Sequence, residues 1–83
     1  MIDEYAADLA AQMGIKLSKV SLVEGRDLGC LDVHLLNLAA DGHLVSAAVY
    51  QSELDTLQSG AGCERLELKI RSALLRLQML LAP

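Results

Sequence analysis

The chain has almost no aromatic side chains: among 83 residues it contains no Trp, no Phe and only Tyr5 and Tyr50. Leu and Ala instead supply most of the apolar content, which is 53%. A core of such residues has little bulk per side chain, and a domain of this size buries roughly 60% of its unfolded surface. The composition therefore predicts one small domain with a narrow stability margin, for which association into a homo-oligomer is a common remedy.

Cysteine is scarce as well, and long apolar runs are missing. Cys30 and Cys63 are too few for a disulfide scaffold, so we interpret them as reduced thiols. Charged residues interrupt every apolar stretch, and none approaches the roughly 20 residues that a membrane-spanning helix needs. The N-terminal segment 1–12 is acidic and lacks the basic region of a signal peptide. These absences predict a cytoplasmic protein with no membrane association.

Basic residues are few in the first three quarters of the chain. Residues 1–62 hold three basic and nine acidic side chains, residues 63–83 hold four basic and two acidic ones, and the net charge is −4. An acidic body argues against broad nucleic-acid binding, in which clustered Lys and Arg neutralise phosphates. The positive charge of the last segment is simply explained as a complement to a helix dipole.

What the chain does contain is a β-hairpin signal in the segment 31–50. Asp41-Gly42 favours a type I′ turn, which needs positive φ at both central residues. A two-residue loop pairs Ala40 with His43 and fixes the register of both arms, whereas a longer loop would shift it. Neither face is cleanly polar, so we expect both faces to be at least partly covered. Alternation places Leu31, Val33, Leu35, Asn37, Leu44, Ser46, Ala48 and Tyr50 on one face, and Asp32, His34, Leu36, Leu38, Val45, Ala47, Val49 and Gln51 on the other.

The remaining segments surround this hairpin in the order α-β-β-β-α. Asp3 can cap a first helix that ends near Gly14, and Ser52 to Asp55 resembles a capping box. We therefore predict a single α+β domain over 1–83, with a three-stranded antiparallel meander packed against a long C-terminal helix. Its expected elements are a helix over 3–13, strands over 15–23, 30–39 and 43–51, a short helical turn over 52–58 and a helix over 63–81.

The strand expected over 43–51 would be an edge of the sheet. It carries no Lys, Arg, Asp, Glu or Pro, and an uncharged edge promotes pairing with another chain unless something covers it. Either a partner adds a strand here or a terminal element lies over the edge, and we favour the partner. The hypothetical interface therefore includes Val45, Ala47 and Val49.

The final helix has two apolar surfaces. A narrow stripe of Leu68, Leu75 and Met79 lies opposite the broad face at spacing i, i+7, i+11. Single exposed apolar residues are common, but three in one row favour an interface. Glu67 and Arg71 form an i, i+4 ion pair on the flank between the surfaces. The broad face, which suits packing on the sheet, consists of Leu66, Ile70, Ala73, Leu74, Leu77, Leu80 and Leu81.

Candidate metal ligands and catalytic residues are dispersed. At about 3.3 Å per strand residue, His34 and His43 lie roughly 20 Å apart along the ribbon, far beyond the ~2 Å reach of a shared metal ion. Cys30, Asp32 and His34 share a strand face, but their side chains project in parallel, so we interpret them as a solvated hairpin end. Cys63 is remote in sequence, and no glycine-rich phosphate loop occurs. The sequence thus predicts no metal site, no cofactor and no catalytic site.

The expected function is a non-enzymatic protein–protein interaction module, a homodimeric small acidic adaptor, chaperone or inhibitor. In size, charge and order of elements the chain resembles secretion chaperones and phage-type inhibitor proteins. The alternative is a nucleic-acid-associated regulator that uses the basic flank Arg65, Lys69 and Arg76 of the final helix. These charges have no interleaved aromatic residues, which favours a solvated helix face. A small enzyme ranks third.

Overall fold

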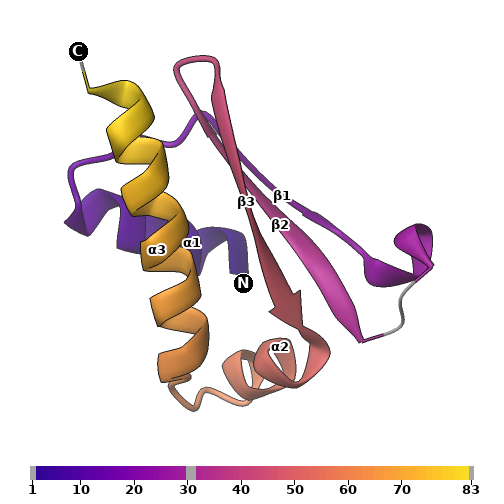
Figure 1. Cartoon of the computed structure of the whole chain (residues 1–83). Coiled ribbons are helices and arrows are strands. Elements are labelled where there is room, and N and C mark those ends of the chain that lie inside the picture. Colours follow the sequence, from indigo (N-terminus) through magenta and orange to yellow (C-terminus); the bar gives the residue numbers. More distant parts are fainter. Residues whose placement is uncertain (1, 30–31, 83) are drawn as a thin grey trace.

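The computed structural model describes residues 2–29 and 32–82 and has the predicted α+β architecture (Figure 1). A three-stranded antiparallel sheet is followed by a long C-terminal helix, and a 3-10 helix lies between the first two strands. The elements are α1 (Ile2–Gln12), β1 (Lys19–Val23), η1 (Gly25–Leu28), β2 (Val33–Ala40), β3 (His43–Tyr50), α2 (Gln51–Gln58) and α3 (Glu64–Leu81).

The hairpin has the register that the Asp-Gly turn predicts. Asp41 and Gly42 have φ values of 49° and 80°, as a type I′ turn requires. Pairing runs from Ala40 opposite His43 to Val33 opposite Tyr50. β2 is the central strand of the order β1-β2-β3, so β1 and β3 are the two edges of the sheet.

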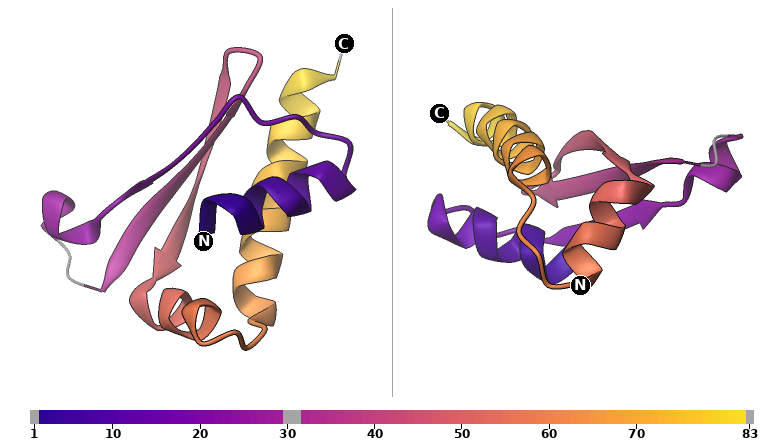
Figure 2. Two further views of the ribbon diagram at one scale, coloured as in Figure 1. Left: turned by 180° about the vertical axis from the view of Figure 1, so that it is seen from behind. Right: turned by 90° about the horizontal axis from the view of Figure 1, so that it is seen from below.

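The helices α1, α2 and α3 gather on one side of the sheet (Figure 2). Burial alternates along β2, where every second residue from His34 to Ala40 is buried and the residues between are only half-buried. The helices thus cover one face, and the residues of β2 on the second face are half-buried. That second face carries a cross-strand hydrogen bond of 2.6 Å from the Ser46 hydroxyl to the Asn37 side-chain oxygen.

The hydrophobic core lies between the sheet face that carries Leu36 and Leu38 and the helices α1 and α3. Five of the seven residues on the predicted broad face of α3 are fully buried, and Leu81 is half-buried. Leu80 is 50% exposed, which corrects its assignment to the core. α1 crosses α3 near its middle (Figure 1), and the last turn, in which Leu81 is only half-buried, is less covered. The buried side chains are Ile2, Ala6, Leu9, Ala10, Ile15, Leu36, Leu38, Ala40, Val45, Ala47, Val49, Leu66, Ile70, Ala73, Leu74 and Leu77.

Some boundaries differ from those expected. β1 begins at Lys19, so residues 15–18 of the expected strand 15–23 are an extended lead-in. The capping box expected from Ser52 to Asp55 is wrong: α2 begins directly after β3, and the carboxylate of Glu53 accepts a 2.8 Å hydrogen bond from the backbone N–H of Tyr50. The start of the expected strand 30–39, at residues 30–31, lies outside the described residues.

Candidate functional site

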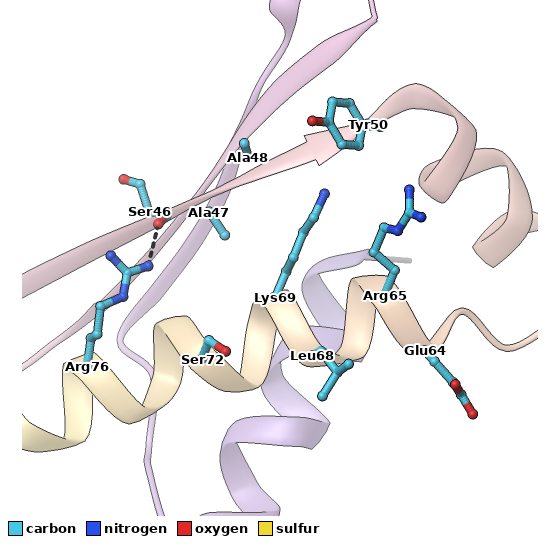
Figure 3. Close-up of a pocket in the computed structure, with 10 residues that line it drawn as sticks. All are labelled: Ser46, Ala47, Ala48, Tyr50, Glu64, Arg65, Leu68, Lys69, Ser72 and Arg76. Carbon is cyan, nitrogen blue, oxygen red and sulfur yellow. Dashed lines mark hydrogen bonds between the residues drawn. The ribbon is translucent and has the colours of Figure 1, made fainter.

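A groove of about 730 Å³ runs between the edge strand β3 and the helix α3 (Figure 3). Three other surface hollows are smaller, with volumes of about 220, 380 and 400 Å³. Strand residues contribute small side chains and one aromatic ring, and the helix contributes mostly polar ones. The lining residues are Ser46, Ala47, Ala48, Tyr50, Glu64, Arg65, Leu68, Lys69, Ser72 and Arg76.

The backbone of β3 faces this groove at every second residue. The hydrogen-bonded pairs of the hairpin continue to Gln51, whose N–H donates to the carbonyl of Asp32 at 2.8 Å. Because the two sides of an antiparallel strand alternate, the N–H and C=O groups of Ser46 and Ala48 point away from β2. The guanidinium of Arg76 confirms this direction, since it donates to the Ser46 carbonyl at 3.0 Å. The groove thus exposes an incompletely paired strand edge.

Three cationic side chains extend from α3 toward β3. In Figure 3 Arg65, Lys69 and Arg76 point to the strand, whereas Glu64 points away from it. Arg65 is exposed and has no hydrogen-bond or ion-pair partner among residues 2–29 and 32–82. Arg76 contacts a neutral carbonyl, so its charge is uncompensated as well. The basic flank predicted from the sequence is therefore a positively charged wall of the groove.

The third cation, Lys69, belongs to a partly buried cluster with Glu53 and Tyr50. Its ammonium group lies 2.8 Å from one carboxylate oxygen of Glu53 and 4.0 Å from the centre of the Tyr50 ring. Glu53 is only 4% exposed, and its second oxygen has no hydrogen-bond partner among the described residues. The cluster joins α2, β3 and α3, and it neutralises one of the three positive charges.

The residues of the predicted interface separate into two groups. Val45, Ala47 and Val49 are 8%, 8% and 0% exposed, so their side chains offer little surface to a partner. They lie on the sheet face that packs against the helices, so their side chains belong to the protein's own core. Only the backbone edge of β3 and its alternate side chains are accessible to a partner.

The stripe of α3 is open in the structure. Leu68, Leu75 and Met79 are 63%, 53% and 78% exposed, on a helix whose opposite side is buried from Leu66 to Leu77. Leu44 on β3 and Leu80 near the end of α3 are also exposed, at 61% and 50%.

His34 is buried, so its interpretation as part of a solvated hairpin end is wrong. It is 8% exposed; the N–H of Gly25 donates to its Nδ1 at 2.8 Å, and its Nε2 lies 2.6 Å from the side-chain oxygen of Gln51. Because Nδ1 accepts a hydrogen, we assign the proton to Nε2, and both ring nitrogens are satisfied. The ring thus ties the η1 turn to the start of α2.

The other candidate ligands do not gather around His34 among the described residues. No group of three His, Cys, Asp or Glu side chains in residues 2–29 and 32–82 is placed to hold a metal ion. Cys63 is a half-buried free thiol, His43 is exposed at the hairpin turn, and Asp32 is exposed. Cys30, which was expected to share a strand face with Asp32 and His34, lies outside the described residues.

Sequence reasoning missed the groove because the strand and the helix that form it were considered separately. The basic flank and the uncharged edge strand were both recognised, but only packing places one opposite the other. It also missed Glu53, whose position next to a strand end gives no signal of burial.

Comparison of the chain with protein-family models, with curated protein sequences and with solved structures finds no match. Within the part of the chain that the structure describes, no helix has the length and apolar character needed to span a membrane.

Proposed function

We propose that the protein is a non-enzymatic protein–protein interaction module that forms a homodimer through the outer stripe of α3. The observation that carries this proposal is the exposure of Leu68, Leu75 and Met79, at 63%, 53% and 78%. These large apolar side chains lie in one row on a helix that is already fully packed on its other side. Contiguous exposed apolar surface marks interaction sites more often than isolated apolar residues do.

The spacing of the stripe favours another helix as the contact. Positions i, i+7 and i+11 follow the 3.5-residue repeat of a coiled-coil seam. In an antiparallel pair of α3 helices with Leu75 near the twofold axis, Leu68 of one copy lies beside Met79 of the other. Such a contact is self-complementary, as the interface of a symmetric dimer must be.

The free energy that this stripe can supply is modest. Complete burial of one large apolar side chain contributes about 1.5–3 kcal/mol, and here roughly two thirds of each side chain remains to be buried. Six such side chains in a dimer give about 6–12 kcal/mol, from which an association cost on the order of 4–15 kcal/mol is subtracted. We therefore expect a dimer that dissociates on dilution and rely on a concentration series to detect it.

Sedimentation equilibrium from the micromolar range to several hundred micromolar tests the dimer. We expect the wild-type protein to shift from monomer to dimer and Leu75→Asp to remain monomeric, since the charge would be buried at the axis. Leu44→Asp is the matched control, because Leu44 is 61% exposed but lies on β3. A wild-type protein that stays monomeric throughout, or equal effects of the two variants, would refute the interface.

The alternative of nucleic-acid binding is less favoured by the charges in the groove. Lys69 is already neutralised by Glu53, which leaves two uncompensated cations, and Glu64 lies on the rim. Phosphate backbones are bound by larger sets of cations. The alternative predicts salt-sensitive gel shifts that Arg65→Ala and Arg76→Ala weaken, and the absence of any shift at low salt would exclude it.

The half-buried free thiol of Cys63 suits a reducing compartment, and on this basis we place the proposed module in the cytoplasm. An enzymatic role is not part of the proposal, because both ring nitrogens of His34 form structural hydrogen bonds.

A further inference from the structure

We propose that the groove between β3 and α3 binds an extended acidic segment of a partner protein, which adds to the sheet as a fourth strand beside β3. This inference rests on the proposed role in protein binding, but it does not depend on the dimer or on the α3 stripe. It identifies the chemistry of the partner: an extended backbone with carboxylates on one side.

The backbone of β3 supplies the first argument. The N–H groups of Ser46 and Ala48 point into the groove, and no partner for them lies among the described residues. An added strand uses such groups for main-chain hydrogen bonds, which provide affinity without a defined sequence. The side chains of Ser46 and Ala48 are small, so an incoming backbone can approach closely.

The cations supply the second argument, because they select an acidic segment. Arg65 and Arg76 are eleven residues apart on one helix, about 16 Å at 1.5 Å per residue. In an extended peptide, two side chains at i and i+4 are about 13 Å apart and point to the same side. Two Glu side chains with this spacing can therefore reach both guanidinium groups.

Arg76 can exchange its hydrogen-bond acceptor when the segment binds. Its guanidinium donates to the carbonyl of Ser46, the same carbonyl that would accept a hydrogen bond from an N–H of the incoming strand. The peptide donor can take over that carbonyl while Arg76 turns to a carboxylate, an ionic partner that forms stronger hydrogen bonds than a neutral carbonyl. The guanidinium thus covers the strand edge until an acidic segment replaces it.

The same charges disfavour a second copy of the chain at this edge. Pairing of β3 with β3 of another molecule would bring two basic walls together, and β3 has no Asp or Glu to compensate them. Like charges placed opposite each other across an interface are repulsive. A separate acidic segment meets the same wall with complementary charge.

The binding test uses a fluorescent nine-residue peptide of alternating Thr and Val with Glu at its third and seventh positions. We expect saturable binding in fluorescence anisotropy with the full-length protein, weakened by salt as ion pairs are. The same peptide with Lys at both positions should not bind. Two further peptides carry N-methyl groups on alternate amides, one at the odd and one at the even positions. One of them should not bind and the other should bind, because only one set of N–H groups faces β3.

Protein variants locate the binding. Arg65→Ala and Arg76→Ala should each lower the affinity for the peptide by about threefold to fivefold, as expected for exposed ion pairs. Arg65→Glu should weaken it by more than about tenfold, because attraction becomes repulsion. Lys16→Glu is the control with the same change of net charge, since Lys16 is exposed and lies outside the groove.

Ala48→Pro tests the strand edge itself. It removes an N–H that faces the groove and leaves the hydrogen bonds to β2 in place, so the peptide should lose binding. Ala48→Thr retains the N–H and should bind, and the differently N-methylated peptides give the same information if Ala48→Pro does not fold.

Any of these results of the peptide experiments would overturn the proposal: no binding at low salt, equal weakening by Arg65→Glu and Lys16→Glu, or equal binding of both N-methylated peptides. Self-association that Ala48→Pro abolishes would also overturn it, by assigning the edge to a second copy. Leu75→Asp separates the two proposals. Peptide binding by this variant supports the groove even if no dimer exists.

Discussion

The buried ion pair between Glu53 and Lys69 gives the sharpest test of how the groove is built. Replacement of Lys69 by Met keeps the aliphatic stem and removes the ammonium group that lies 2.8 Å from the carboxylate. Glu53, only 4% exposed, would then keep one hydrogen bond, from the backbone N–H of Tyr50, and no counter-charge within the described residues. Burial of an unpaired charge is one of the most costly consequences of a single substitution.

The magnitude follows from the exposure of both partners. Breaking a fully buried pair costs about 3–5 kcal/mol, but the Lys69 side chain is 27% exposed, so we expect about 2 kcal/mol for Lys69→Met. Glu53→Gln retains an acceptor for Tyr50 and should cost about 1 kcal/mol. In the Gln background Lys69→Met loses mainly its contact with the Tyr50 ring, about 0.5 kcal/mol at such a site.

Urea denaturation of the four proteins of this double-mutant cycle measures the coupling. We expect a coupling free energy of about 1.5 kcal/mol, and a fall in melting temperature of about 8–16 °C for Lys69→Met alone, given the scaling for domains of 60–100 residues. If the two substitutions are additive, or if Lys69→Met changes the free energy of unfolding by less than about 0.5 kcal/mol, the pair does not hold α2 and α3 together.

The remaining predictions concern the hairpin turn and the alkaline stability. Gly42→Ala should destabilise the protein by about 1 kcal/mol in urea denaturation, because φ is +80° there although a Cβ would meet no atom within 4 Å. Gly62→Ala is the control and should have little effect, since φ is not positive at Gly62 and the space is equally open. Equal effects of the two substitutions would contradict the assignment of the turn. Burial, followed by the nearby carboxylate of Glu67, raises the pKa of Tyr5 above its ordinary value of 10.0, so the folded state retains this proton more strongly than the unfolded state does. The resulting stabilisation is complete below about pH 10 and is lost as the pH rises through the folded-state pKa. The urea midpoint should therefore fall at alkaline pH, and Tyr5→Phe should remove the part of this fall that Tyr5 causes. An unchanged fall in the variant would show that other groups cause it.

Much of the fold could be predicted from local patterns in the sequence. Asp41-Gly42 determines the turn because few other dipeptides tolerate two positive φ values. The two-residue turn then determines which residues pair across β2 and β3. The broad apolar face of α3 predicts its core contacts because a 3.6-residue period leaves one side for packing. Leu80 shows the limit of this reasoning, since its position on the helix is favourable but it is 50% exposed in the tertiary structure.

The candidate site was less predictable, because its parts come from separate segments. Local pattern identified the uncharged strand and the basic flank Arg65, Lys69 and Arg76, but it could not place them face to face. It also assigned Val45 to an interface, since alternation defines two faces of a strand without saying which one the helices cover. The burial of Glu53 beside Lys69 likewise depends on how α2 and α3 meet.

The sequence by itself determined the order of the elements, the hairpin register and the two apolar surfaces of α3, because turn chemistry and periodicity act over a few residues. The tertiary structure alone decided which sheet face is buried, which charge is neutralised by Glu53, and that Arg65 and Arg76 face an open strand edge. Those features depend on contacts between segments distant in the chain. Their free energy comes from packing and charge pairing that no local pattern encodes.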